Sequence, residues 1–316
     1  MGAVTLQNIR KTYEKGTVLA VDDVSFTVEP GELFGLIGPD GAGKTSIFRI
    51  LTTLLLADSG TATVDGHDVR KDYRAIRSTV GYMPGKFSLY QDLTVEENLS
   101  FFATLFETTI AANYDLIKEI YEQIEPFKTR RAGQLSGGMK QKLALCCALI
   151  HKPTVLFLDE PTTGVDAVSR KEFWDMLGRL KQQGITILVS TPYMDEATRC
   201  ERIALMQSGK ILSIDTPANI IKAYPGKLYA VKADAMHPLL HHLRAYPAAR
   251  SSYAFGEFVH VAFWDDQADD DEALRQYLAG KKHTGIVIKP ITPSIEDRFI
   301  DLMTAAPANA HATATR

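Results

Sequence analysis

The sequence is poor in three features that would direct it to other protein classes. Cysteine occurs only at Cys146, Cys147 and Cys200 in 316 residues, which is too few for a disulfide framework and lacks the paired spacing of a zinc site. No apolar run approaches the roughly 20 residues that cross a bilayer, and the first residues lack the apolar core of a signal peptide. The formal net charge of -3 gives no reason to expect a nucleic-acid partner. We expect a reduced, cytoplasmic protein whose membrane part, if any, is another chain.

Two regions with different patterns divide the chain. Residues 1–224 alternate short β-rich runs with helical periodicity, which is typical of an α/β fold with helices packed against a sheet. A helix is predicted at Val168–Gln183, ended by Gly184. The clearest predicted strands are Val24–Val28, Leu33–Ile37, Val155–Leu158, Ile185–Ser190 and Arg202–Met206. The last three are nearly continuous apolar runs, as expected of strands that are buried on both faces.

Residues 225–303 predict a second, smaller domain. Its elements follow the order β-α-β-β-α-β, which indicates a ferredoxin-like α+β domain. They are predicted at Leu228–Lys232, Pro238–Tyr246, a hairpin over Ser252–Phe263 turning near Gly256, Asp271–Ala279 and Gly285–Pro290, before a last helix at Ser294–Met303. Residues 304–316 are rich in Ala, Thr and Pro and are predicted to be a disordered tail.

A phosphate-binding motif follows the predicted strand Leu33–Ile37. Residues 38–45 match G-x-x-x-x-G-K-[ST] and open a helix near Lys44, which is the context that such a loop requires. Glycines let the backbone approach phosphates, and N–H groups at the helix N-terminus supply positive potential. Lys44 would reach the β- and γ-phosphates, and the Thr45 hydroxyl would bind Mg²⁺. The residues predicted to contact nucleotide here are Gly38, Pro39, Asp40, Gly41, Ala42, Gly43, Lys44, Thr45 and Ser46.

Two acidic residues follow the apolar strand Val155–Leu158, in the form of a Walker-B motif. Asp159 is predicted to hold Mg²⁺ through water, and Glu160 to polarise the attacking water as a general base. The alternative for a pair of acids after a strand is a solvated turn. A complete phosphate loop in the same chain argues against that alternative.

The segment Leu135-Ser136-Gly137-Gly138-Met139-Lys140-Gln141 resembles the signature of ABC ATPases. The resemblance covers residues 1 to about 224 and is nearest to subunits of drug exporters, such as daunorubicin-resistance ATPases, which often carry a small C-terminal domain. It implies a P-loop NTPase fold with a helical signature subdomain. It also implies a head-to-tail dimer, in which the P-loop of one subunit and Ser136, Gly137 and Gly138 of the other enclose ATP.

Two further residues match positions of the family pattern. Tyr13 matches the aromatic residue that stacks on adenine, although an early tyrosine alone is usually a core or surface residue. Asp166, within Gly164-Val165-Asp166, matches the loop that crosses the dimer interface.

Two positions depart from the family pattern. A glutamine that touches Mg²⁺ and water is replaced by Gly85, and a histidine that contacts the γ-phosphate is replaced by Pro192. Glycine has no side chain, and proline offers neither a donor side chain nor an N–H. Losing one preorganised donor lowers kcat by roughly 10²–10³-fold in another enzyme class. We therefore expect the chain's own site to bind ATP well and to hydrolyse it poorly.

An intact signature beside a weakened site favours a heterodimer with a second ABC ATPase over a homodimer. The resemblance implies that both ATPases work with integral-membrane permease subunits of an exporter. It also implies that this chain lies on the inner face of the membrane. Phe87, Leu89 and Tyr90 are candidates for the permease contact, with ordinary subdomain core as the alternative. Two other functions stay open: a regulatory ATP-binding switch with little hydrolysis, and a soluble ABC ATPase not tied to transport.

Overall fold

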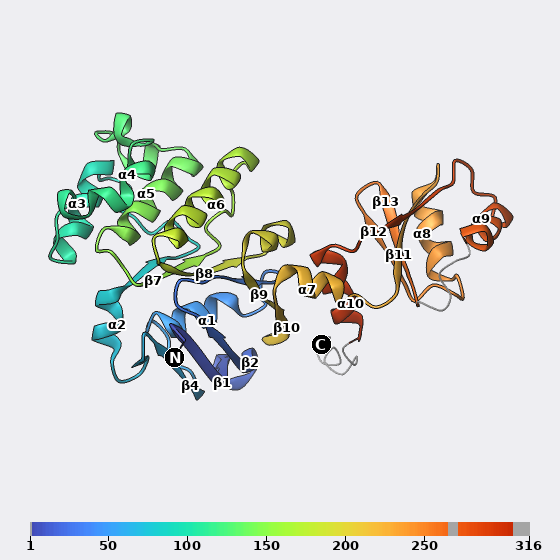
Figure 1. The fold of residues 1–316 in the computed structure, drawn as a ribbon, viewed down its shortest axis with the longest axis horizontal. Helices are drawn as coiled ribbons and strands as arrows, with labels where there is room; N and C mark the ends of the chain where they lie inside the picture. The colour runs from blue at the N-terminus through green and yellow to red at the C-terminus, as the bar shows by residue number, and fades with distance from the viewer. Residues whose placement is uncertain (1, 265–270, 306–316) are drawn as a thin grey trace. The chain divides into compact units, whose positions relative to one another are not determined.

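The computed structural model describes residues 2–264 and 271–305 (Figure 1). The chain separates into two compact units, residues 1–218 and 219–316. The boundary lies a few residues before the expected one at 224, and the assignment of residues 1–224 and 225–303 to two functional domains stays a prediction. Helix α10 (Ile295–Ala305) continues two residues into the predicted tail, and residues 306–316 lie outside the described residues.

A six-stranded sheet forms the centre of the first unit, with strand order β10-β9-β3-β8-β7-β6. Its strands are β3 (Leu33–Ile37), β6 (Val80–Met83), β7 (Val155–Asp159), β8 (Thr186–Thr191), β9 (Arg202–Gln207) and β10 (Lys210–Asp215). All neighbouring pairs are parallel except β9 with β10. Every residue of β3, β7 and β8 is buried, which is why these runs lack polar alternation. The predicted strands of this sheet are confirmed.

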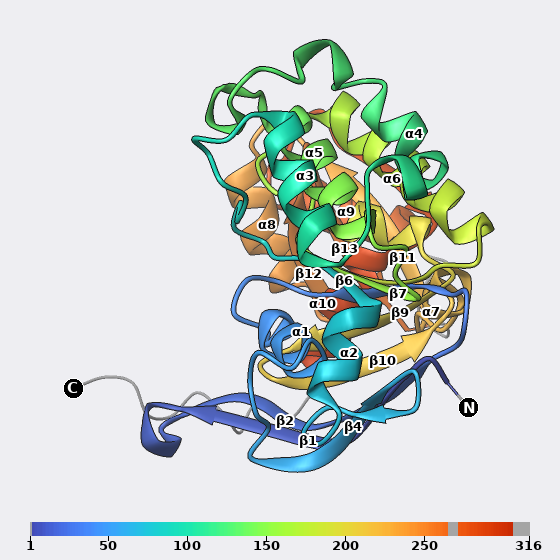
Figure 2. The same cartoon turned by 90° about the vertical axis from the view of Figure 1, so that its left-hand side faces the viewer.

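A second, antiparallel sheet packs against the first unit's core, with strand order β2-β1-β4-β5. Its strands are β1 (Val4–Tyr13), β2 (Val18–Val28), β4 (Ser59–Val64) and β5 (His67–Asp68). Helix α1 (Lys44–Leu51) lies between the two sheets, as Figure 2 shows. Of this sheet, the sequence predicts only the part Val24–Val28. Register shifts between β1 and β2 break the alternation of apolar and polar residues that would have revealed it.

The remaining helices of the first unit include a group formed by α3, α4 and α5 (Figure 1). Their bounds, with α2 and α6, are α2 (Tyr73–Thr79), α3 (Val95–Leu105), α4 (Tyr114–Tyr121), α5 (Gly137–Leu149) and α6 (Ala167–Gln182). Short 3-10 turns occupy Glu14–Gly16, Ala111–Asn113, Glu125–Phe127, Ala132–Gln134 and Met194–Arg199. Thr94 and Glu97 form a capping box at the start of α3: the Glu97 N–H donates to the Thr94 side chain, and the Thr94 N–H donates to the Glu97 carboxylate.

The second unit confirms the predicted β-α-β-β-α-β order. Its elements are α7 (Pro217–Lys222) at the boundary, then β11 (Lys227–Lys232), α8 (Met236–Arg244), β12 (Ser251–Phe255), β13 (Phe258–Phe263), α9 (Asp271–Gly280), β14 (Val287–Ile291) and α10. The sheet is antiparallel with order β12-β13-β11-β14. Buried side chains of β11, α8, β13 and α9 form its core, among them Val231, Leu239, Leu243, Val261 and Leu278. Across the described part of the chain, no helix has both the length and the apolar character that a membrane crossing requires.

Candidate active site

The phosphate-binding motif forms the turn that connects β3 to α1. Gly43 caps the helix with a left-handed φ of 106°, and a Cβ placed there would lie 2.2 Å from the carbonyl oxygen of Ala20. A Cβ on Gly38 would lie 2.1 Å from the carbonyl oxygen of Met206. Both positions therefore require glycine, one for conformation and close approach and the other for close approach alone. The positions of these two glycines in the motif are thus also required by the packing of the backbone around them.

A cavity of about 210 Å³ opens over this turn. Its lining joins the turn and the start of α1 to one residue from β2 and one that follows β7: Ala20, Gly41, Ala42, Gly43, Lys44, Thr45, Ser46 and Glu160. The structure thus brings Glu160 to the predicted phosphate loop across more than a hundred residues of sequence. Ala20 was not predicted, because an alanine in an apolar strand carries no sequence signal for a site.

Lys44 is the cation of this cavity and is only 3% exposed. Its Nζ donates to the carbonyl oxygens of Gly38 and Pro39, at 2.7 and 3.0 Å, and lies 3.1 Å from Oε1 of Glu160. A buried ammonium group needs compensating negative charge, and here one partly exposed carboxylate supplies it. Such a cation at the edge of a glycine-rich cradle has the chemistry to bind a phosphate group.

Ser190 connects the two predicted acids. Its Oγ donates to Oδ1 of Asp159 at 2.7 Å, and it accepts from the backbone N–H of Glu160 at 2.9 Å. Asp159 is 2% exposed, at the end of β7. Glu160 has a φ of 50°, a left-handed conformation that is uncommon for a residue with a side chain and that the Ser190 contacts hold in place. Burial, together with the nearby charge of Asp159, raises the pKa of Tyr82 in β6 to about 12.

Both departures from the family pattern lie where the strands of the central sheet end. A Cβ placed on Gly85 would lie 3.1 Å from the carbonyl oxygen of Asp159 and 3.9 Å from Cβ of Glu160. Pro192 follows Thr191, the last residue of β8. Gly85 therefore passes directly beside the two acids, and neither departure position offers a polar side chain there.

Tyr13 ends β1 and reaches the phosphate loop. Its hydroxyl lies 3.0 Å from Oγ of Ser46, in the first turn of α1, and its side chain is half-buried. An aromatic ring is thereby held beside the cavity that Ser46 lines.

The signature residues lie elsewhere on the first unit. Ser136 caps α5, its Oγ accepting from the N–H of Met139 at 3.4 Å, and it is exposed. Ser136, Gly137 and Gly138 are not among the described residues that line the cavity over Lys44. A Cβ on Gly138 would lie 2.9 Å from Oγ of Ser169, so the start of α5 packs against the start of α6. The structure leaves this helix N-terminus open to a ligand from outside the chain's own cavity.

Asp166 caps α6, and this role was not predicted. Its Oδ1 accepts from the N–H groups of Val168 and Ser169, at 3.1 and 3.0 Å. The hydrogen bond from the Ser169 backbone is the main cause that lowers the pKa of Asp166 below its usual range. The residue is exposed, so it could also meet another chain.

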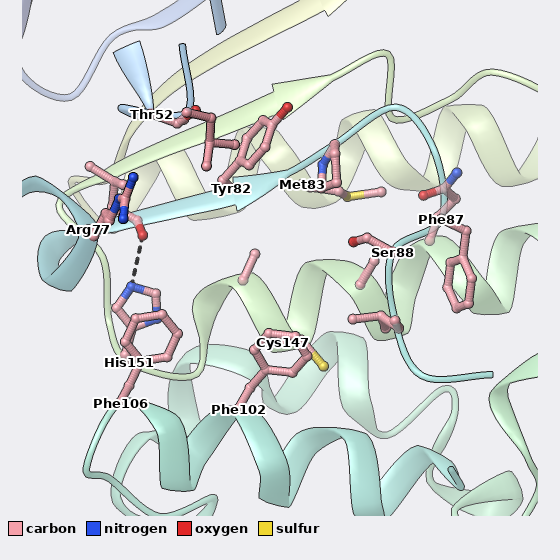
Figure 3. Close-up of a pocket in the computed structure, with 17 residues that line it drawn as sticks. Thr52, Arg77, Tyr82, Met83, Phe87, Ser88, Phe102, Phe106, Cys147 and His151 are labelled. Carbon is pink, nitrogen blue, oxygen red and sulfur yellow. Dashed lines mark hydrogen bonds between the residues drawn. The ribbon is translucent and has the colours of Figure 1, made fainter. Parts of the chain in front are cut away.

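A second, apolar cavity of about 320 Å³ lies between β6, α3 and α5. Figure 3 shows Phe87 and Ser88 toward one end of it and His151 with Phe106 toward the other. Of the three residues predicted to touch a permease, Phe87 and Leu89 line this cavity, and Tyr90 is 51% exposed, with its ring against Phe101. Leu89 is 7% exposed, which favours the alternative of subdomain core for that residue.

Several known proteins are similar to this chain in sequence. A family model described as ABC transporter matches residues 21–163. The chain is 39% identical to the probable multidrug ABC transporter ATP-binding protein YbhF of Escherichia coli K12, over 96% of this chain and 52% of that protein. It thus spans about half the length of that relative. It is also 39% identical to the doxorubicin resistance ATP-binding protein DrrA of Mycobacterium tuberculosis, over 72% of this chain and 69% of that one. With the Nod factor export ATP-binding protein I of Burkholderia pseudomallei the identity is 39%, over 95% of this chain and 96% of that one.

Solved structures resemble about two thirds of this chain in fold. One is cbiO1 of Clostridium perfringens, part of the ABC transporter complex cbiONQ, with a TM-score of 0.63, 24% identity and coverage of 70% of this chain and 91% of that one. Another is an ATP-binding cassette solved as a dimer in a post-hydrolysis state with ADP and Pi. It has a TM-score of 0.61, 25% identity and coverage of 67% of this chain and 98% of that one.

Proposed function

This chain belongs to the family of ABC transporter ATP-binding proteins, the ABC ATPases, and on that premise we propose that it hydrolyses ATP to power an exporter. The observation that carries the proposal is the cavity in which Lys44, the phosphate loop and Glu160 meet. The names of the relatives, which refer to multidrug transport, doxorubicin resistance and Nod factor export, support export as the direction.

The residues around the cavity fit a magnesium nucleotide. Lys44 and the amides at the start of α1 would hold the phosphates, and the Tyr13 ring would stack on adenine. The Thr45 hydroxyl and Asp159 would hold Mg²⁺, and Ser190 already orients the Asp159 carboxylate. When bound, the ion would neutralise charge on the phosphate oxygens. Glu160 would accept a proton from the attacking water, provided that it first leaves Lys44.

We propose that this site turns over slowly because Gly85 and Pro192 leave it without two polar groups. The close approach of Gly85 to Asp159 and Glu160 supports that reading, because a longer side chain at this position would project beside the acids. The residues proposed to bind the nucleotide are all present. Slow hydrolysis with good binding is therefore the expected behaviour of the chain's own site.

We propose that this chain pairs with a second, different ABC ATPase subunit. Its P-loop would carry the ATP that Ser136, Gly137 and Gly138 cover, with Asp166 at the interface between the two chains. The exposed N-terminus of α5 supports this arrangement, since its groups have no role in the chain's own cavity. Permease subunits would engage the chain near the apolar cavity, through Phe87 and Tyr90, and would hold it at the inner face of the membrane.

The test is steady-state ATP hydrolysis by the purified chain, alone and mixed with a candidate second ABC ATPase subunit. We expect slow hydrolysis alone and stimulation on mixing. Ser136→Arg in this chain should abolish the stimulation, because it blocks the helix N-terminus offered to the partner, whereas Glu160→Gln should spare it. Brisk turnover by the chain alone that is lost with Glu160→Gln would overturn the heterodimer proposal.

A regulatory ATP-binding switch is the second candidate function. Gly85 and Pro192 favour it, because both remove polar groups from the neighbourhood of the acids. The same assay separates the two: a switch binds ATP without stimulated turnover in any mixture. A soluble ABC ATPase not tied to transport is the third, and it predicts turnover that is indifferent to permease.

A further inference from the structure

A buried carboxylate outside the phosphate cavity joins three segments of the first unit. Glu196 lies in the 3-10 turn Met194–Arg199 and is 5% exposed. The Thr162 hydroxyl donates to its two oxygens, at 2.9 and 3.1 Å, and the Thr191 hydroxyl donates to Oε2 at 2.5 Å. Nη1 of Arg170, in α6, lies 3.8 Å from Oε1. Glu196 is not among the described residues that line the cavity over Lys44.

Each partner of Glu196 belongs to a segment with a proposed role in ATP turnover. Thr191 ends β8, directly after Ser190, which holds both Asp159 and Glu160. Thr162 lies two residues after Glu160, at the start of the loop that ends at Asp166. Arg170 follows Asp166 in α6. A single carboxylate thus fixes the loop 161–166 against the end of β8.

The same loop touches the signature. Thr162 and Val165 line a small hollow together with Gly138 of α5 and Ser169 of α6. The carbonyl oxygen of Gly164 is 3.5 Å from the position that a Cβ on Gly137 would take. A shift of loop 161–166 would therefore move the surface against which the signature packs.

The segment that contains Pro192 depends on the Glu196 carboxylate and its partners for its position. Arg170 lies over the Tyr193 ring, with Cζ 4.7 Å from the ring centroid, and the Tyr193 N–H donates to Thr191 at 3.0 Å. Pro192 itself has no N–H and no polar side chain with which to hold the segment. The segment 192–195 is therefore held by Thr191 and Arg170, both partners of the Glu196 carboxylate, and by the Glu196 N–H, which donates to the carbonyl oxygen of Tyr193 at 3.3 Å.

We propose that Glu196 is a positioning residue for ATP turnover, which holds loop 161–166 so that Asp166 and the signature are presented to the partner subunit in one fixed arrangement. The inference rests on the proposed function. Glu196 does not touch the nucleotide site, so its loss leaves nucleotide binding at the Lys44 cavity in place. It acts on the rate because a misplacement of about 1 Å can lower turnover by roughly 10²-fold.

The experiment uses residues 1–316, alone and assembled with the proposed second ATPase subunit and permease. Glu196→Gln is expected to lower kcat by roughly 10–100-fold while KM, and the affinity for a fluorescent ATP analogue, change by less than about twofold. Thr162→Val should reproduce this effect because it removes the hydroxyl at nearly constant shape. Thr162→Ser, which keeps the hydroxyl, should retain the kcat of the natural chain.

Glu32→Gln is the matched control. Glu32 is also a buried carboxylate, 7% exposed and 3.2 Å from Nη1 of Arg202, but it precedes β3 at the opposite end of the sheet. Its variant should lose stability without the loss in kcat. Hydrogen exchange gives a second measurement: the amides of residues 163–166 should exchange faster in Glu196→Gln, and those of residues 41–46 should not.

The outcomes separate the inference from the proposed function. An unchanged kcat in Glu196→Gln and Thr162→Val, in a chain that hydrolyses ATP, would overturn the inference alone. Equal losses of kcat in Glu196→Gln and Glu32→Gln would do the same, because they would reflect general destabilisation. A natural chain that neither binds the analogue nor hydrolyses ATP in any assembly would overturn both.

Discussion

Nζ of Lys44 lies 3.1 Å from Oε1 of Glu160, so the cation assigned to phosphate and the carboxylate assigned to water neutralise each other in this structure. A phosphate group that binds Lys44 must compete with Glu160 for the ammonium group. Phosphate binding and the release of Glu160 from Lys44 are thereby linked. The Glu160 carboxylate becomes free when the phosphate pairs with Lys44.

Replacement of Lys44 by alanine should abolish most nucleotide affinity. The phosphates lose a buried cation, which corresponds to about 2–3 kcal/mol, or roughly a 30–150-fold weaker Kd. Titration of a fluorescent ATP analogue checks this value. Lys181→Ala, which removes a surface lysine paired with Glu201, is the control and should leave Kd unchanged. Equal affinities for all three chains would mean that nucleotide binds elsewhere.

Tyr13 should contribute by its ring and not by its hydroxyl. Tyr13→Phe loses the contact with Ser46 but keeps the ring, and we expect less than about a threefold change in Kd for ATP. Tyr13→Ala removes the ring and should weaken binding by about 1–2 kcal/mol, the range of base stacking on aromatic side chains. Isothermal titration with ATP measures both. The reverse order of effects would assign the residue to packing of the phosphate loop.

Restoring the two missing polar groups should raise turnover. We expect the double variant Gly85→Gln with Pro192→His to hydrolyse ATP roughly 10–100-fold faster than the natural chain, because single donors of this kind are each worth about 10²-fold in other enzymes and do not add fully. Gly85→Ala is the control for backbone effects, since its Cβ meets the Asp159 carbonyl at 3.1 Å but carries no polar group. Steady-state kinetics of the isolated chain checks it; no gain in the double variant would locate the cause of slow turnover elsewhere.

Asp297 anchors α10 to the sheet of the second unit. Its carboxylate is 1% exposed, accepts from Tyr253 at 2.7 Å and lies 2.6 Å from Nδ1 of His260; it also accepts from the N–H and hydroxyl of Ser294. Burial alone raises the pKa of Asp297, but the hydrogen bonds from Ser294, Tyr253 and His260 together outweigh it, so the pKa lies below its usual value. The ionised carboxylate therefore stabilises the second unit.

Asp297→Asn should lower the free energy of unfolding of this unit by about 2–3 kcal/mol at pH 7. A carboxyl with a lowered folded pKa stabilises above its unfolded pKa of about 3.9, and loses this effect as pH falls through the folded pKa. The difference between the two chains should therefore shrink below about pH 4. Urea unfolding followed by Trp264 fluorescence, in a Trp174→Phe background, reports on this unit. Glu257→Gln, at an exposed carboxylate paired with Lys232, should change nothing measurable, and a constant difference at all pH values would refute the assignment.

Contiguous motifs made the phosphate loop, Asp159 and Glu160 predictable from sequence. Each of them places its chemistry within a few residues, so local spacing is enough to predict a role. Ala20, Ser190 and Glu196 were not found, because each acts on a residue far away in sequence. Ser190 can hold Asp159 only because β8 lies beside β7, and nothing in an apolar run states which strand will be its neighbour.

In the fold too, features set by local sequence were predictable, and features set by contacts distant in sequence were not. The β-α-β-β-α-β order of the second unit was predictable because short elements with distinct periodicity alternate along the chain. The strand Val4–Tyr13 escaped prediction, because bulged pairing with β2 removes its alternation. Leu89 was a candidate for the permease contact, yet it is only 7% exposed. This burial depends on the side chains that pack around it, which the local sequence does not state.

The sequence by itself determined the family, the phosphate loop, the paired acids, the signature and the two departures at Gly85 and Pro192, since these depend on residue type and spacing along the chain. Only the tertiary structure decided that Lys44 pairs with Glu160, that Gly85 passes beside the acids and that Glu196 joins loop 161–166 to β8. The physical reason is that these contacts arise from strand order and packing, which bring together residues with no local relationship in the chain.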